Sequence, residues 1–286
     1  KARKQDVMRK GTYDDVRIQS MPDRVKAVTL MGTLLHMEDY VGDEEGWVEP
    51  ELFGLLGRLN EEDLRSTMEQ IWEGKEKDLT VHVFKWVDKI TSPMEKMADA
   101  AQKYISEGAS FLDYETASGF QSLLLARSAT ERRKNVRIVA TARKALPFVN
   151  ARFNFQKNGF EDNIKLIHDT GIEVYENRVF DIVLANVAHE ELEHFLRFIK
   201  THLSTNGVIL YNRTDENAAA VEEACKAARC TFSLLKGDVY EITQIQNETM
   251  SVPSNAETSP QLLAHSELRT VLAYHTPLIL DLDRIR

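Results

Sequence analysis

The chain has 286 residues, of which 43% are hydrophobic and 28% are charged, and it carries a formal net charge of −9. At ~100–200 residues per domain, this length and composition indicate a globular protein with one large domain or two smaller ones. The acidic charge excludes a protein that binds nucleic acid over its whole surface but leaves room for a local basic patch. No apolar run approaches the ~20 residues of a membrane span, so no membrane partner is expected.

The first hundred residues show helical patterns, and residues 21–92 are predicted to form an α-helical N-terminal region behind a basic arm at residues 1–20. Asn60 precedes three acidic residues, as in a capped helix start, and Ser92 with Pro93 signals a further start. Apolar spacing and these signals predict helices over residues 22–38, 50–59, 61–73, 79–90 and 92–106. The chain begins at a lysine, which leaves open a processed mature protein, after removal of an organellar transit peptide, or a trimmed chain.

From residue 109 onward, short apolar runs alternate with helical patterns. This alternation implies right-handed crossovers and a parallel sheet with helices on both faces. Strands are predicted at residues 109–114, 136–140, 163–169, 179–186, 208–212, 230–242 and 268–277. The last two have no helix between them, so we expect an antiparallel hairpin joined by an exposed insertion at about 246–267. The predicted fold class is α/β: a Rossmann-like, seven-stranded, mostly parallel sheet with an antiparallel terminal hairpin over residues 93–286.

The segment FLDYETASGF at residues 111–120 has the layout of a loop that holds a phosphate or a cofactor. An apolar strand ends in an aspartate, and small residues with one glycine lead into an apolar helix. In doubly wound sheets, ligands bind at such turns at the carboxyl ends of the strands. Here the sequence resembles the class I S-adenosylmethionine-dependent methyltransferases, whose first strand ends in an acid followed by G-x-G-x-G. The resemblance covers roughly residues 93–280 and rests mainly on order and spacing.

The resemblance implies a binding site for S-adenosylmethionine. On its pattern, Asp113 is the strand-end acid and Gly119 the last glycine, while the first two glycines fall on Glu115 and Ala117. Ala140 falls at about the position where the family has an acid that bonds both ribose hydroxyls. Glycine permits positive φ and close approach of a cofactor, whereas Glu115 adds bulk and negative charge near the expected methionine carboxylate. We therefore expect a cofactor site that is weakened or lost.

Two other strand ends fit the family pattern better. Asp169 ends the third strand, where the family contacts the adenine amino group, and Asn186 ends the fourth, where family residues face the transferred methyl group. Taken alone, Asp181 and Asn186 are more simply explained as strand-edge capping and turn residues. No catalytic triad is suggested by spacing. The histidines of HEELEH at 189–194 are five residues apart, not four, so no metal site is predicted.

A basic segment at residues 127–144 carries seven cations against one acid, Glu131. In an acidic protein such a concentration is a candidate contact for a phosphate backbone, and a solvated basic turn is an equal alternative. The residues predicted to contact nucleic acid are Arg127, Arg132, Arg133, Lys134, Arg137, Arg143 and Lys144. The basic arm at residues 1–20 is expected to become ordered on a nucleic acid or protein surface.

Three hypotheses follow. The first is a methyltransferase-like protein without catalysis that serves as a binding or assembly component of a ribonucleoprotein such as a mitochondrial ribosome, a setting that the resemblance implies. Its partners would be RNA, ribosomal proteins or other ribonucleoprotein components, bound through the basic segments and the helical N-terminal region. The second is an active S-adenosylmethionine-dependent methyltransferase acting on RNA or a ribosomal protein, since direct displacement needs mainly proximity and alignment. The third, a dinucleotide-binding oxidoreductase, lacks G-x-G-x-x-G and the acid after the second strand.

The two cysteines, Cys225 and Cys230, match no zinc-binding spacing. They are expected to be free thiols in a reducing intracellular compartment. The mitochondrial matrix is one such compartment, and it agrees with the setting that the resemblance implies.

Overall fold

The computed structural model describes residues 21–35, 48–74, 78–168, 175, 178–212, 218–235 and 239–244. The basic arm, Asp169, the expected insertion and the strand predicted at 268–277 lie outside the described residues. The chain divides into two units, Lys1–Ile245 and Gln246–Arg286, and all described residues belong to the first. The domain boundaries predicted from the sequence stay predictions.

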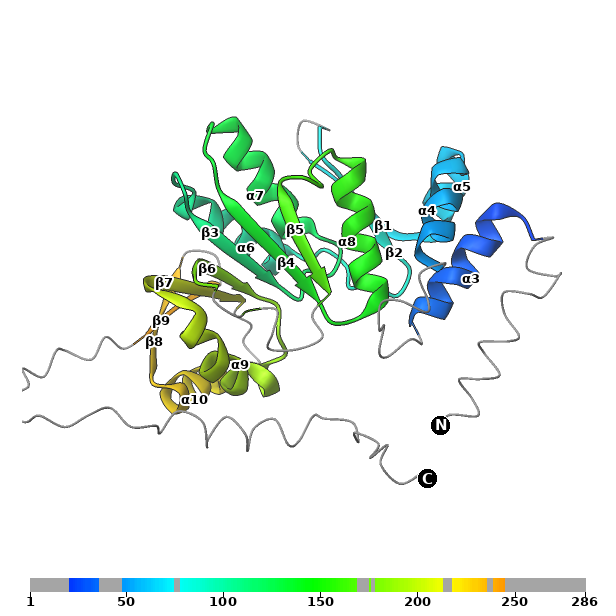
Figure 1. The fold of residues 1–286 in the computed structure, drawn as a ribbon. Helices are drawn as coiled ribbons and strands as arrows, with labels where there is room; N and C mark the ends of the chain where they lie inside the picture. Colours follow the sequence, from blue (N-terminus) through cyan, green and yellow to red (C-terminus); the bar gives the residue numbers. More distant parts are fainter. Residues whose placement is uncertain are drawn as a thin grey trace, which may run out of the picture. The chain divides into compact units, whose positions relative to one another are not determined.

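A seven-stranded sheet forms the centre of the first unit. Its strands are β3 (Ser110–Tyr114), β4 (Arg137–Ala142), β5 (Ile164–His168), β6 (Phe180–Ala185), β7 (Leu203–Asn212), β8 (Cys230–Leu235) and β9 (Val239–Gln244). Their order in the sheet is β5-β4-β3-β6-β7-β9-β8 (Figure 1). The first five run parallel to one another, and β9 is antiparallel to both β7 and β8. The predicted fold class, a mostly parallel sheet with an antiparallel terminal hairpin, is confirmed.

The terminal hairpin uses a different pair of segments from the predicted one. The stretch at residues 230–242, predicted as one strand, supplies both β8 and most of β9. Residues 236–238, Lys-Gly-Asp, separate the two strands, and glycine and aspartate favour tight turns. The prediction of a single strand here was wrong because this turn signal was not used.

Five helices pack on the sheet: α6 (Ser92–Ala101), α7 (Phe120–Glu131), α8 (Ala145–Lys157), α9 (Leu192–Ile199) and α10 (Ala218–Ala228). The helix predicted over 92–106 ends at Ala101 and continues as one 3-10 turn, η1 (Gln102–Tyr104). Neighbouring strand residues point to opposite faces, so Phe111 joins a core with α6, α7 and α8, while Leu112 joins a core with α9 and α10. Both side chains are fully buried.

Within the described residues, the N-terminal region holds three helices and a β-hairpin. Helices α3 (Asp23–Leu35), α4 (Val48–Arg58) and α5 (Glu61–Thr67) occupy predicted positions, and Asn60 caps α5 by accepting a hydrogen bond from the Asp63 N–H (2.8 Å). The helix predicted over 61–73 stops at Thr67, and no helix forms over 79–90. Instead β1 (Met68–Glu73) pairs antiparallel with β2 (Thr80–Phe84). The prediction of helix over residues 68–73 and 79–90 was therefore wrong.

A helix, not a third strand, binds the free backbone edge of β2. Two asparagines of α8 and its C-cap Asn158 each accept a hydrogen bond from a β2 N–H: Asn150 from Phe84 (3.0 Å), Asn154 from His82 (2.9 Å) and Asn158 from Thr80 (3.1 Å). Their side-chain amides donate back to the β2 carbonyls. Two residues of a strand span ~6.6 Å and four residues of a helix ~6 Å. The spacings match closely enough for this asparagine ladder to follow the strand.

His82 lies at the middle of the asparagine ladder. Its side chain is 5% exposed and stands edge-on to Phe153, with ring centroids 5.7 Å apart. Burial, helped by the charges of Lys157 and Arg65, lowers the pKa of His82 to about 4. The imidazole is therefore neutral at pH 7 and packs as part of the core between β2 and α8.

Candidate functional site

The turn between β3 and α7 has the backbone of a glycine-rich loop although it holds a single glycine. Glu115 (φ 57°), Ala117 (φ 50°) and Gly119 (φ 81°) all lie in the left-handed region. These are the three positions at which the family pattern has glycine, the residue that adopts positive φ without strain. Because other L-residues lose about 1–2 kcal/mol there, the surrounding structure must hold Glu115 and Ala117 in place.

Hydrogen bonds from two neighbouring elements hold this loop, residues 115–119. The Thr116 N–H donates to the Thr141 carbonyl of β4 (2.8 Å), and the Asn154 amide of α8 donates to the Ser118 carbonyl (2.8 Å). Within the loop, the Gly119 N–H donates to the Thr116 carbonyl (2.9 Å). The loop conformation is thus fixed by contacts within the protein.

Asp113, the strand-end acid, is fully buried and already bonded. Its Oδ2 accepts from Thr116 Oγ1 (2.6 Å), the Ser122 N–H (3.1 Å) and Ser122 Oγ (2.7 Å), and its Oδ1 accepts from Asn186 Nδ2 (3.2 Å). Burial raises the pKa of Asp113, and these hydrogen bonds oppose the shift. The carboxyl group braces the loop and the start of α7.

Asn186 follows β6 and reaches the same carboxyl group from 73 residues away. Its Nδ2 also donates to Gln121 Oε1 in the first turn of α7 (2.8 Å), and its backbone N–H donates to the Tyr114 carbonyl (3.2 Å). The structure therefore brings together Asp113 and Asn186, two of the predicted site residues. Gln121, which the sequence analysis missed, and Ser122 are the two polar residues in the otherwise apolar run from Phe120 to Ala126, and that is the signal that marks them.

An ion pair stands over the loop. The Glu115 carboxylate pairs with the Arg143 guanidinium, and Arg143 also lies 3.5 Å from Glu191. Although burial acts to lower the pKa of Arg143, the Glu115 carboxylate raises it above its ordinary value, so the guanidinium is charged. The Glu115 side chain is 19% exposed and that of Arg143 is 50% exposed. The pair joins the first glycine position of the pattern to the end of β4.

The end of β4 lies two residues beyond the position taken from the sequence. Ala140 pairs with Asp113 inside the sheet, and the strand continues to Ala142, after which comes Arg143. The strand end was predicted at Ala140, but the buried run of this strand extends through Ala142. Neither alanine side chain can accept a hydrogen bond from a ribose hydroxyl. The residue next to this strand end is a cation, where the family pattern has an acid.

The seven predicted nucleic-acid residues are distributed over α7, the turn before β4 and both ends of β4. Arg137 opens β4 while Arg143 and Lys144 follow it, and six strand residues span about 20 Å. Arg127 pairs with Glu131 on its own helix (2.8 Å). The exposed cations that remain together in sequence, around the turn that leads into β4, are Arg132, Arg133, Lys134 and Arg137.

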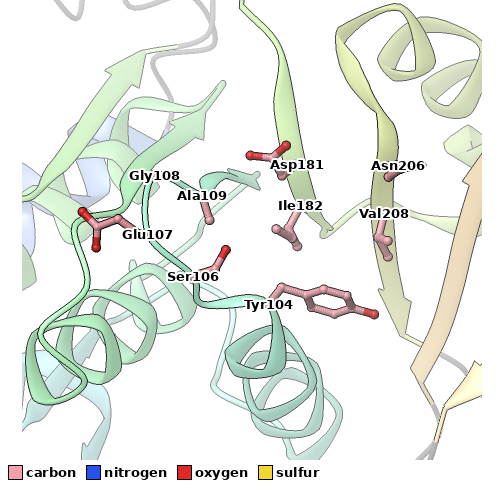
Figure 2. Close-up of a pocket in the computed structure, with 9 residues that line it drawn as sticks. All are labelled: Tyr104, Ser106, Glu107, Gly108, Ala109, Asp181, Ile182, Asn206 and Val208. Carbon is pink, nitrogen blue, oxygen red and sulfur yellow. The ribbon is translucent and has the colours of Figure 1, made fainter.

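A pocket of about 330 Å³ lies at the amino ends of β3, β6 and β7, across the sheet from the loop (Figure 2). Its polar groups are engaged in structural contacts. Asp181 Oδ2 accepts from the Ser110 N–H (2.9 Å) and Ser110 Oγ (2.9 Å), and the Tyr104 hydroxyl donates to Glu241 (2.8 Å). Although burial acts to raise the pKa of Asp181, the bonds from Ser110 lower it. Since ligands of such sheets bind at the carboxyl ends, this pocket is not the candidate cofactor site.

Other features of the described residues carry no site. Within them, no group of three or more histidines, cysteines, aspartates or glutamates is placed to hold a metal ion. No helix in the same ranges combines the length and the apolar character needed to cross a bilayer. Cys225 and Cys230 are free and buried, and burial raises the pKa of Cys225 to about 12. His189 and His194 are exposed.

No protein-family model matches the chain, and no curated protein sequence matches it significantly. Solved structures do match. The precorrin-6y C5,15-methyltransferase of Geobacter metallireducens GS-15 is 16% identical with a TM-score of 0.46, over 57% of this chain and 92% of that one. The ribosomal protein L11 methylase of Lactobacillus delbrueckii subsp. bulgaricus is 17% identical with a TM-score of 0.47, over 57% and 83%. A methyltransferase of Pyrococcus furiosus is 17% identical with a TM-score of 0.42, over 55% and 85%. At these identities the likeness concerns the methyltransferase-like fold.

Proposed function

We propose that this chain is a non-catalytic methyltransferase-like protein that serves as a binding or assembly component of a ribonucleoprotein. The observation that carries the proposal is the ion pair between Glu115 and Arg143. Its side chains stand where the family pattern places the methionine end and the ribose of the cofactor. Binding would require the pair to open and would bring the cofactor carboxylate towards Glu115, an unfavourable like-charge contact.

The other residues of the expected cofactor site do not compensate for this unfavourable contact. The Asp113 carboxyl is bonded to four protein donors, and Ala142 offers no acceptor for the ribose hydroxyls. The residues of the loop therefore do not fit S-adenosylmethionine. The sheet and the loop backbone persist as a scaffold.

The rival function is an active methyltransferase that acts on RNA or a ribosomal protein. Two observations favour it. The loop keeps positive φ at all three glycine positions of the pattern. In addition, the buried Ser118 hydroxyl has no hydrogen-bond partner among the described residues. An active enzyme would need Arg143 to leave Glu115 when the cofactor enters.

Calorimetric titration with S-adenosylmethionine and S-adenosylhomocysteine separates the two functions. For the unchanged, folded chain we expect no heat of binding up to about 1 mM ligand, which corresponds to a binding free energy weaker than about −4 kcal/mol. A Glu115→Gly/Ala142→Asp variant removes the ion pair and supplies a ribose acceptor, so it is expected to bind measurably. Binding by the unchanged chain at micromolar affinity or better would overturn the proposal and restore the enzyme to first place.

RNA is the partner that we propose for the basic turn before β4. Arg132, Arg133, Lys134 and Arg137 are exposed there, and Arg132 is oriented by donating to the Gln102 carbonyl (2.6 Å). Lysine and arginine neutralise phosphates and release counterions, which supplies affinity without sequence preference. A reducing compartment such as the mitochondrial matrix is the proposed location, since a mitochondrial ribosome is the proposed setting.

An RNA-binding measurement tests this turn. Fluorescence anisotropy with a labelled ribosomal RNA hairpin is expected to show an Arg133→Glu/Lys134→Glu variant binding at least ~10-fold more weakly than the unchanged chain, with a salt slope smaller by ~2. A Lys165→Glu/Lys226→Glu variant makes the same charge change at two other exposed sites and is expected to lose less than ~2-fold. Equal losses in the two variants would show that the basic turn has no special role.

A further inference from the structure

The basic turn before β4 is bonded to the segment that leads into β3. The Arg132 guanidinium donates to the Gln102 carbonyl (2.6 Å), and the Gly108 N–H donates to the Asn135 carbonyl (2.8 Å). Strands β3 and β4 are paired from their first residues, so the two segments form one surface at the amino ends of these strands. Lys103 follows Gln102 in the chain and is exposed. It therefore belongs to the same surface as the basic turn.

Cations predominate on this surface, which we call the amino-edge patch. Three acids lie near them. Glu131 is paired with Arg127 on its own helix (2.8 Å), and Glu107 and Asp181 accept hydrogen bonds from backbone N–H groups (3.2 and 2.9 Å). In a chain with a net charge of −9, an excess of cations at one place favours a polyanion as the partner. The cations of the amino-edge patch are Lys103, Arg132, Arg133, Lys134 and Arg137, all exposed.

The amino-edge patch is rigid and polar. Its two segments are joined by hydrogen bonds and lead directly into paired strands. Besides charged residues, the exposed positions of these segments hold Ser106, Gly108 and Asn135. Small polar residues bond to phosphate and sugar groups, whereas proteins that bind single strands stack the bases on aromatic side chains. A fixed array of cations is preorganised for phosphates that are themselves held in place, as they are in a helical duplex.

We propose that the amino-edge patch docks the phosphate backbone of double-stranded RNA. The inference rests on the proposed role in a ribonucleoprotein, and it adds the class of RNA and the contact from Lys103. Double-stranded RNA is recognised mostly by its shape and through its phosphates and 2′-hydroxyl groups, which are the groups that such a patch can bind.

The docked duplex would lie away from the cofactor loop. Arg137 opens β4 and Arg143 follows its last residue, and these two residues are about 20 Å apart along the strand. Phosphates bound beside Arg137 therefore do not reach the ion pair of Arg143 with Glu115. Docking is thus independent of whether the loop binds a cofactor.

Fluorescence anisotropy with two forms of one RNA tests the class of partner. The probes are a labelled duplex of about 16 base pairs, the length that a double-stranded RNA-binding domain covers, and one of its strands alone, chosen to be unstructured. We expect the full chain to bind the duplex at least ~10-fold more tightly than the single strand. Equal or tighter binding of the single strand would overturn the proposal.

Lys103→Glu tests the extent of the amino-edge patch. This variant is expected to bind the duplex at least ~5-fold more weakly, with a salt slope smaller by ~1. Lys144→Glu is the matched control, because it makes the same charge change at an exposed residue beyond the other end of β4. We expect it to lose less than ~2-fold. Circular dichroism verifies that both variants are folded, and equal losses would contradict a patch at the amino ends of the strands.

The outcomes separate this inference from the proposed function. If Arg133→Glu/Lys134→Glu weakens RNA binding but the unchanged chain does not prefer the duplex, RNA remains the partner and only the docking of a duplex is overturned. Micromolar binding of S-adenosylmethionine together with a duplex preference would overturn the non-catalytic function and leave the docking surface in place.

Discussion

Replacing Gly119 with alanine is expected to lower the free energy of unfolding by about 2–5 kcal/mol. A Cβ atom at this position would lie 2.4 Å from Phe155 Cε1, 2.9 Å from Phe155 Cζ and 3.3 Å from Ala151 Cα. The left-handed φ of 81° contributes about 1–2 kcal/mol of this loss. The clash with the buried Phe155 ring and the α8 backbone contributes about 1–3 kcal/mol more.

The matched control is Gly159→Ala. Gly159 has a similar φ of +71°, but a Cβ atom there would meet nothing within 4 Å. Only the backbone term remains, so we expect a loss of about 1 kcal/mol. Urea denaturation followed by circular dichroism measures both variants. Equal losses would mean that the contact between the loop and α8 does not restrict Gly119.

This comparison explains which glycine of the pattern the chain has kept. Gly119 is required because α7 begins against α8, where no side chain fits. At Glu115 the side chain has room to leave the loop and pair with Arg143. The presence of Gly119 is therefore explained by packing alone. It is not by itself a sign that the loop binds a cofactor.

The parallel part of the sheet was predictable because each of its five strands is a short apolar run next to a helical pattern. The hairpin β1–β2 was not predictable in this way. The backbone of β2 is bound by asparagines 66–78 residues away in the sequence, and a local pattern does not contain such contacts. The residues 61–90 carry helix signals such as the Asn60 cap, and tertiary contacts override them after Thr67.

The candidate site was also predictable in part. Asp113 and Asn186 stand at strand ends, and parallel strands bring such ends to one edge of a sheet. The partner of Glu115 was not predictable, because Arg143 was assigned to the basic segment as a nucleic-acid contact. That segment is short in sequence, but it includes β4, so Arg137 and Arg143 lie at opposite ends of this strand. Clustering in sequence therefore did not predict clustering in space.

Replacing Asn154 with alanine is expected to lower the free energy of unfolding by about 3–4 kcal/mol. The side chain is fully buried. It accepts from the His82 N–H (2.9 Å) and donates to the His82 carbonyl (2.7 Å) and the Ser118 carbonyl (2.8 Å). The His82 carbonyl would keep its bond from Asn150 (2.8 Å), whereas the His82 N–H and the Ser118 carbonyl would lose their partner, and each buried backbone group left without one destabilises the fold by about 1–3 kcal/mol. The better helix propensity of alanine offsets only about 0.5 kcal/mol.

Gln156→Ala, on the exposed side of the same helix, is the matched control and is expected to change stability by less than ~0.5 kcal/mol. Within the asparagine ladder, Asn154 is the residue that bonds both the hairpin and the loop. Its replacement should therefore also loosen these two segments locally. Amide hydrogen exchange at His82 and at the Thr116 and Gly119 N–H groups is expected to accelerate together in Asn154→Ala. Acceleration at His82 alone would contradict the link to the loop. Joint acceleration would identify α8 as the element that holds Glu115 and Ala117 in their unfavourable left-handed conformations.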